Sequence, residues 1–124
     1  WEFIVYDDKD LLNLISNRCK NHYMAKDAPL AIIVLGNKNK EKSPMYTYQD
    51  LSAATENILL RATSLGLGTV WCGINPFVVP SQKVSELLSL PVNIEPLGLI
   101  QIGYPDEIKE ERTQYNEKYV HFYE

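Results

Sequence analysis

Residues Thr47 to Pro76, TYQDLSAATENILLRATSLGLGTVWCGINP, are the most informative part of this chain about its fold. Its first part predicts one long helix, because apolar residues recur there at three- and four-residue spacing. Further leucines and alanines widen this apolar stripe, so we expect the helix to be buried. Thr47 followed by Asp50 resembles a capping box with Asp in place of Glu, which predicts a helix start near Tyr48.

The second part of the stretch predicts a turn and a short strand. Gly66 stands where a left-handed helix end is expected, and Gly68 then leads into an apolar run. That run consists of Thr69, Val70, Trp71 and Cys72. Its β-branched and aromatic residues favour a buried strand, which ends at Gly73. Because glycine has no side chain, the backbone at Gly73 can approach a planar ligand closely.

The flanking sequence alternates between predicted strands and helices. We expect strands at residues 3–6, 30–35 and 97–102, a helix over residues 11–20, and another that opens at Ser81 and stops before Pro91. Residues 30–35 are apolar throughout, which is typical of a strand covered on both faces and places it in the middle of the sheet. The charged residues 106–118 predict a surface tail, and the apolar end that follows must pack on something.

Length and composition limit the possible functions. The chain has 124 residues, of which 45% are hydrophobic, so it can bury a core and we expect residues 1–124 to form a single domain. The net charge of −4 and the lack of a basic stripe argue against nucleic acid as a partner. No apolar run is long enough for a membrane helix, and no signal peptide or metal-binding spacing is present. Cys19 and Cys72 stand in unlike contexts, so we expect free thiols in a cytoplasmic protein.

The order D-L-x-A-A-x-x-N-x-L-L-x-A-x-x-L-G-L-G-T-x-W-x-G, from Asp50 to Gly73, resembles the flavin-dependent nitroreductase family. The later segments Pro96 to Pro105 and Arg112 to Tyr115 agree with this resemblance, which covers essentially all of the chain. It implies an α+β fold in α/β/α layers, with a central mixed sheet flanked by helices. It also implies an intertwined homodimer with flavin at the interface.

The resemblance also implies a set of cofactor-binding residues. Gly73 and Ile74 match the family's backbone contacts to the flavin ring of FMN, with Trp71 and Cys72 close beside them. Arg112 matches the family's basic residue that grips the cofactor phosphate, although Gln114 stands where many relatives have a second basic residue.

Each of these residues also has a structural interpretation. Gly73 can simply make a turn, Trp71 can fill the core, and Arg112 can be a solubilising charge. Cys72 is better interpreted as a small buried hydrophobe than as a redox group, because nothing nearby in the sequence would stabilise a thiolate. No side chain is predicted to be catalytic, since flavin carries the chemistry itself.

The function that the resemblance implies is an FMN-dependent oxidoreductase. It would take electrons from NADH or NADPH and pass them through flavin N5 to a nitroaromatic, quinone or similar small-molecule acceptor. The chain opens at Trp1 without a methionine, so we expect a piece of a longer protein that lacks an N-terminal, flavin-contacting segment. The alternative is a truncated or degenerate family member that acts as a non-catalytic flavin-binding or protein-interaction module.

Overall fold

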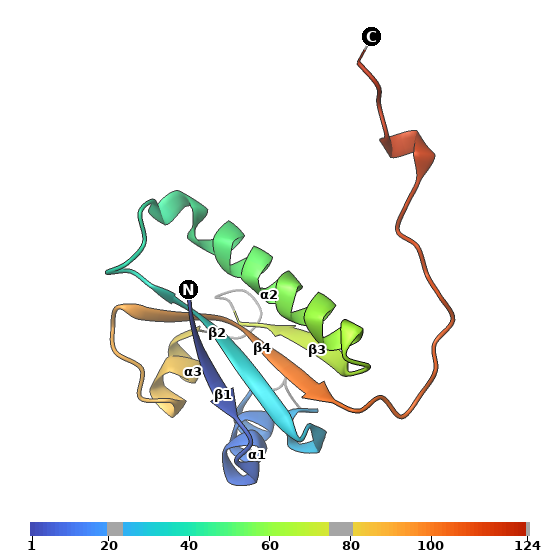
Figure 1. Cartoon of the computed structure of the whole chain (residues 1–124). Helices are drawn as coiled ribbons and strands as arrows, with labels where there is room; N and C mark the ends of the chain where they lie inside the picture. Colours follow the sequence, from blue (N-terminus) through green and yellow to red (C-terminus); the bar gives the residue numbers. More distant parts are fainter. Residues whose placement is uncertain (20–23, 75–80, 124) are drawn as a thin grey trace.

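A computed structural model describes residues 1–19, 24–74 and 81–123 of the chain. Four strands form one sheet in the order β1-β2-β4-β3. The helix α2 covers one face of this sheet, and α1 and α3 cover the other (Figure 1). The strands are β1 (Glu2–Tyr6), β2 (Leu30–Asn37), β3 (Gly68–Gly73) and β4 (Ile94–Gly103). The α-helices are α1 (Lys9–Arg18), α2 (Thr47–Ser64) and α3 (Ser81–Leu87).

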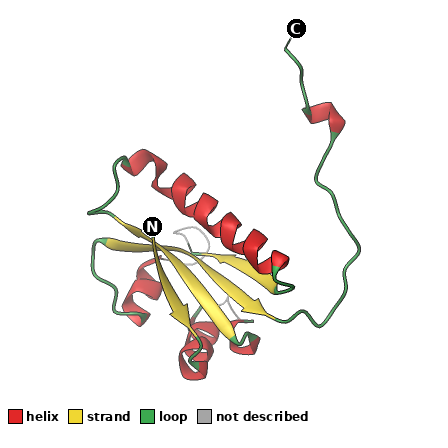
Figure 2. Ribbon diagram, viewed as in Figure 1, coloured by secondary structure: helices red, strands yellow, loops and turns green. Residues whose placement is uncertain are grey.

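The layered α+β architecture confirms the predicted fold class (Figure 2). The central position predicted for residues 30–35 is also confirmed, because β2 lies between β1 and β4. The prediction of a mixed sheet was wrong for the described strands, whose three pairings are all antiparallel. The reason is that α2 joins β2 to β3, which are not neighbours. The later strand β4 inserts between them and runs antiparallel to both.

On one face of the sheet, α1 and α3 close a continuous hydrophobic core. Leu12 and Ile15 of α1 and Val84 of α3 pack against Ile33 and Leu99 of the sheet, and all five are almost fully buried. The start of α1 is fixed by a side-chain cap. The Asp8 carboxylate accepts hydrogen bonds from the backbone amides of residues 10 and 11, at 2.8 and 3.1 Å.

The start of α2 differs from the predicted capping box. A 3₁₀ turn, η3 (Pro44–Tyr46), runs directly into the helix, and Tyr46 is the cap residue without a side-chain bond. Thr47 already lies inside α2, and its hydroxyl donates to the Glu41 carboxylate. The prediction of Thr47 as the cap was therefore wrong, because the preceding turn supplies the helical backbone one residue earlier.

The helix α2 is buried on one side only, so the prediction of a buried helix was wrong. Leu51, Thr55 and Ala62 face the sheet and are 5% exposed or less. Leu60 and Leu65 are 60% and 57% exposed. A wide apolar stripe indicates that a helix needs extensive cover, but in this chain the sheet covers only part of it. No helix in the described residues combines the length and apolar character that crossing a membrane requires.

The end of α2 follows the prediction closely. Gly66 takes a φ of +74°, the left-handed conformation that glycine tolerates. The amide of Leu67 donates to the carbonyl of Ala62 at 3.0 Å, and the amide of Gly66 donates to the carbonyl of Thr63 at 3.0 Å. These bonds satisfy the last carbonyls of the helix and aim the chain into β3.

Polar side chains tie β1 to the segment between β2 and α2. The Glu2 carboxylate accepts hydrogen bonds from Asn37 at 2.7 Å and from the Lys40 ammonium at 2.8 Å. Farther along the same end of the sheet, the Tyr48 hydroxyl donates to Glu95 at 2.9 Å. The first strand, the centre of the sheet and the first turn of α2 are thus connected at one end.

The C-terminal tail, residues 104–123, leaves the end of β4 and extends away from the sheet (Figure 1). It holds one 3₁₀ turn, η4 (Glu117–Tyr119), and all of its residues are exposed. The predicted surface position of the charged part is confirmed. The apolar end was expected to pack on something, but Phe122 and Tyr123 are 87% and 104% exposed in this single chain.

Candidate functional site

The candidate ligand site lies at the free edge of β3, where this strand ends. In the sheet order, β3 has β4 on one side and no other strand of the described chain on the other. The backbone amide of Ile74 donates to the carbonyl of Leu97 on β4 at 2.7 Å. Successive amides of a strand point in opposite directions, so the N–H of Gly73 points away from β4 to the open edge. Gly73 therefore directs a backbone donor to the edge of β3 that pairs with no other described strand.

Ile74 contributes to this site in a different way. Its amide is used within the sheet, and its side chain is 2% exposed in the core on the α1 and α3 side. Neither the amide nor the side chain of Ile74 is therefore directed to the open edge of β3. Residues 75–80, which continue the quoted stretch, lie outside the described residues.

Trp71 lies on the same face of the sheet as α2. Its indole covers Gly98 of β4, where a Cβ atom would stand 2.4 Å from the indole Nε1. Glycine at position 98 is thus what allows the indole to lie flat against the sheet. Because Trp71 is 39% exposed on an edge strand, the expected buried strand is instead half-exposed. Trp71 is thus partly buried, with its indole against Gly98 and part of its surface exposed.

Cys72 faces the opposite side of β3, as strand alternation requires. Its sulfur accepts a hydrogen bond from Nε2 of Gln101 at 3.3 Å, and Gln101 is 5% exposed. Burial raises the pKa of the Cys72 thiol, and the bond from Gln101 lowers that pKa by a smaller amount. The thiol is therefore neutral near pH 7, which agrees with the structural interpretation of Cys72. Sequence patterns could not identify Gln101, because its contact with Cys72 depends on the β3–β4 register.

Arg112 is not brought to Gly73 within one chain. The tail that carries Arg112 leaves β4 after Gly103, which pairs with Gly68 at the start of β3. Gly73 lies at the other end of β3, about 17 Å away along a strand of this length. The Arg112 side chain is exposed in the tail. The structure thus groups Trp71, Cys72, Gly73 and Ile74 and leaves Arg112 apart from them.

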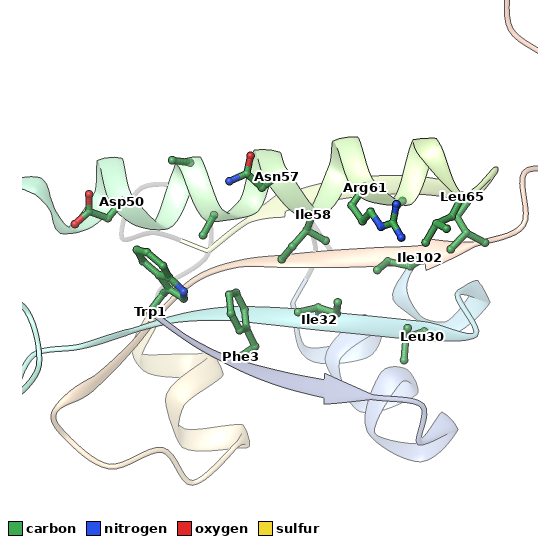
Figure 3. Close-up of a pocket in the computed structure, with 14 residues that line it drawn as sticks. Trp1, Phe3, Leu30, Ile32, Asp50, Asn57, Ile58, Arg61, Leu65 and Ile102 are labelled. Atoms are coloured by element: carbon green, nitrogen blue, oxygen red, sulfur yellow. The ribbon is translucent and has the colours of Figure 1, made fainter.

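A second feature is an apolar groove between α2 and β1, which sequence reasoning missed (Figure 3). It has a volume of about 600 Å³. Phe3 of β1 and Ile32 of β2 form part of its floor, and the wall along α2 carries Asp50, Asn57 and Arg61. The groove lies at the opposite edge of the sheet from β3, so it is separate from the Gly73 site.

The layered fold agrees with that of solved nitroreductase-like proteins. A Clostridium acetobutylicum protein described provisionally as an NADH oxidase is 38% identical, with a TM-score of 0.90 over 98% of this chain and 74% of its own. An FMN-dependent nitroreductase from Clostridium difficile is 33% identical, with a TM-score of 0.85 over 98% of this chain and 74% of its own.

Sequence relatives point the same way. A protein of Methanothermobacter thermautotrophicus, named provisionally as an NADH dehydrogenase/NAD(P)H nitroreductase, is 39% identical over 121 residues. The match includes 98% of this chain, which spans 63% of that relative's length. The nitroreductase family model matches residues 1–104, and the chain belongs to this family. The tail with Arg112 lies beyond the part that the family model matches.

Proposed function

We propose that this protein is an FMN-dependent oxidoreductase that passes electrons from NADH or NADPH to a small-molecule acceptor such as a nitroaromatic or a quinone. Family membership supports the class of reaction, and a structural neighbour is described as an FMN-dependent nitroreductase. The observation that carries the proposal is the amide of Gly73, which points to the open edge of β3. A planar ring can lie against this edge because Gly73 has no side chain in its way.

The residues at this edge fit a flavin ring. FMN, when bound, supplies reversible hydride chemistry, so the chain has to bind, orient and shield the ring. The Gly73 amide would donate to the polar edge of the ring, and the backbone of Ile74 would lie next to this contact. Trp71 and Cys72 would flank the ring from opposite sides of the strand, and the neutral thiol of Cys72 would act by packing.

We propose that Arg112 binds the FMN phosphate from a second subunit of an intertwined homodimer. A planar guanidinium matches phosphate geometry well. Within one chain the tail extends away from the sheet, so Arg112 does not lie at the Gly73 site of its own chain (Figure 1). The exposed apolar end of the tail supports a docking role, since Phe122 and Tyr123 find no cover in one chain.

We place the protein in the cytoplasm. Neither Cys19 nor Cys72 forms a disulfide within the described residues. Burial raises the pKa of the Cys19 thiol, as it does for Cys72, so neither is poised to form a disulfide. Buried, neutral thiols are typical of proteins that stay in a reducing compartment.

A flavin titration tests the proposal. We would titrate this chain with FMN and with riboflavin and follow flavin fluorescence and the visible absorption band. We expect FMN to bind more tightly than riboflavin, because only FMN offers a phosphate to Arg112. Replacing Arg112 by glutamine should remove the preference and leave riboflavin affinity unchanged, while Arg18→Gln on α1 serves as a matched control. Equal affinity for both flavins in the original chain would contradict the role of Arg112.

The same experiment separates the enzyme from the non-catalytic module. FMN binding followed by NADH or NADPH oxidation with an added quinone or nitroaromatic would support the oxidoreductase. FMN binding without oxidation by either nucleotide would instead favour the module. Failure of the chain, and of a longer protein of the relatives' length, to bind any flavin would refute the proposed cofactor.

A further inference from the structure

Gln101 is a buried polar side chain with apolar neighbours on the α1 and α3 face of the sheet. It lies on β4 between Ala31 of β2 and Val70 of β3, and it is 5% exposed. The buried Thr55 hydroxyl, by comparison, donates to the carbonyl of Leu51 within its own helix at 2.8 Å. Burying an amide among apolar side chains costs free energy unless the amide finds good partners. The presence of Gln101 therefore needs an explanation other than packing.

The hydrogen-bond partner of Gln101 is a weak acceptor. Its Nε2 donates to the sulfur of Cys72 at 3.3 Å, and a thiol sulfur accepts hydrogen bonds only weakly. The bond runs diagonally between the strands, because Gln101 lies opposite Val70 and Cys72 lies opposite Leu99. A methionine at position 101 would fill a similar space without an amide to desolvate. Stability alone would therefore favour an apolar residue here.

The bond from Gln101 ends on the residue that directly precedes the proposed flavin contact. Cys72 is followed by Gly73, whose amide points to the open edge of β3. Glycine is the least restricted residue in its backbone angles, and Gly73 pairs with a second glycine, Gly98. Neither glycine has a side chain that could hold this end of β3 in place. An anchored side chain at Cys72 therefore restricts the backbone just before Gly73.

The backbone just after Gly73 is held at an irregular part of the neighbouring strand. The amide of Ile74 donates to the carbonyl of Leu97 at 2.7 Å. The register between β2 and β4 shifts between Val34 and Leu35, which makes Leu97 the extra residue on β4. An extra residue of this kind bends a strand and increases its twist. The direction of the Gly73 amide thus depends on one backbone bond at a bend and on the side-chain bond of the preceding residue.

We propose that Gln101 is a positioning residue for the flavin-binding end of β3. From inside the core, and through Cys72, it keeps the Gly73 amide directed to the edge where the ring would bind. The inference rests on the proposed function and adds to it a residue outside the ligand contacts. Residues that break the rules of core packing are expected at functional sites, where they order the site at the expense of stability. Stability and ring affinity should therefore respond differently to the loss of this amide.

Replacing Gln101 by methionine tests this separation. Methionine has a similar length but donates no hydrogen bond. Gln101→Met should be at least as resistant to urea as the original chain. It should bind riboflavin on the order of tenfold more weakly, because the end of β3 must then be ordered on binding. FMN should lose the same factor, since Arg112 is untouched. Leu99→Met makes a volume-conserving change opposite Cys72, keeps the Gln101 amide, and should leave riboflavin affinity unchanged.

A double-mutant cycle shows whether Gln101 acts through Cys72. In a Cys72→Ala background the bond is already absent, so Gln101→Met should cause no further loss of riboflavin affinity. An equal loss in both backgrounds would overturn the proposed route. A Gln101→Met chain that loses stability and affinity together would show a merely structural residue, and one that keeps full riboflavin affinity would show no positioning role.

Amide hydrogen exchange followed by NMR supplies a measurement that needs no flavin. The Ile74 amide should exchange faster in Gln101→Met, because its bond to Leu97 opens more often once the preceding residue is released. The amides of β1, at the opposite edge of the sheet, should exchange as in the original chain. An unchanged rate at Ile74 would overturn the inference. If neither flavin bound to the original chain, the proposed cofactor would be in question, and the exchange rate would still decide whether Gln101 holds the end of β3.

Discussion

The two faces of the sheet differ in how completely this chain covers them. On the α1 and α3 face, side chains from both helices and from the central strands enclose one another, and most are fully buried. On the α2 face, one helix covers part of the strands, and an apolar groove stays open beside it. The first face is complete within one chain, and the second is complete only when something fills the groove. The degree of burial on the second face therefore depends on what lies in the groove.

The largest expected effect compares neighbouring isoleucines on β2. Ile33 faces the closed core and is 0% exposed, whereas Ile32 lines the groove. Ile33→Ala should lower the free energy of unfolding by about 2–5 kcal/mol, because it leaves a cavity in a packed core. Ile32→Ala should cost the monomer only about 1–2 kcal/mol, since less apolar surface is lost from the interior. Urea unfolding at low protein concentration measures both.

Protein concentration sharpens this comparison. If a second subunit of the proposed homodimer covers the groove, the cost of Ile32→Ala should rise with protein concentration, because the dimer buries this side chain more fully. The cost of Ile33→Ala should stay constant. Equal costs for the two substitutions at low concentration would show that the faces are equally closed in one chain, and the comparison would then fail.

A smaller effect is expected where Trp71 closes the α2 face at the edge of β3. Gly98→Ala adds a Cβ atom at 2.4 Å from the indole nitrogen, so the indole must move. We expect a loss of about 1–3 kcal/mol in the free energy of unfolding and a change in the emission of Trp71. The emission is best recorded with Trp1 replaced by phenylalanine. In a Trp71→Ala background the same glycine substitution should cost much less, and an undiminished cost would show that the indole is not the obstacle.

Much of the fold could be predicted from local sequence, and the failures have physical causes. The periodicity of α2 and the glycine that ends it are local properties, so the helix and its left-handed end were predicted correctly. The apolar run of β2 gave its central position. Burial of α2 and β3 was overestimated, because exposure depends on which elements lie opposite. The antiparallel sheet was missed, because strand direction follows from the insertion of β4.

The candidate site was predictable in part. The resemblance pointed to Gly73, and its role as a ligand contact stays a prediction. The direction of its amide depends on the bond from Ile74 to Leu97, which no local pattern reveals. The groove was missed for a similar reason, since its floor and its α2 wall come from segments that lie far apart in the sequence.

A still smaller effect is expected for the pKa of Cys72, which lies on the α1 and α3 face of the sheet. Burial raises the pKa of Cys72, and the Gln101 amide partly offsets this by donating to the sulfur. Gln101→Leu removes the donor, so the pKa of Cys72 should rise further. The rate of thiol alkylation against pH, measured with Cys19 replaced by alanine, should shift to higher pH. Gln114→Leu in the tail is the control, and an unchanged profile for Gln101→Leu would show that the bond does not tune the thiol.

The smallest expected effect on stability concerns Glu2 of β1, an edge strand of the sheet. Hydrogen bonds from Lys40 and Asn37 hold the pKa of Glu2 below its ordinary value of 4.5. A carboxyl group with a lowered pKa in the folded state stabilises the fold above its unfolded pKa, and this stabilisation is lost as pH falls through the folded value. Glu2→Gln should therefore be slightly less stable than the original chain at neutral pH, and the difference should vanish in acid.

Urea unfolding midpoints of the two chains from neutral to acidic pH measure this difference. Glu107→Gln is the matched control, because the ion pair of Glu107 with Lys109 joins two residues of the tail and no other element. It should leave the midpoint unchanged at every pH. If Glu2→Gln also left the unfolding midpoint unchanged at every pH, the hydrogen bonds of Glu2 would not contribute to the stability of the fold. In that case β1, which borders the groove, would be held in place only by its pairing with β2 and by packing on the α1 and α3 face.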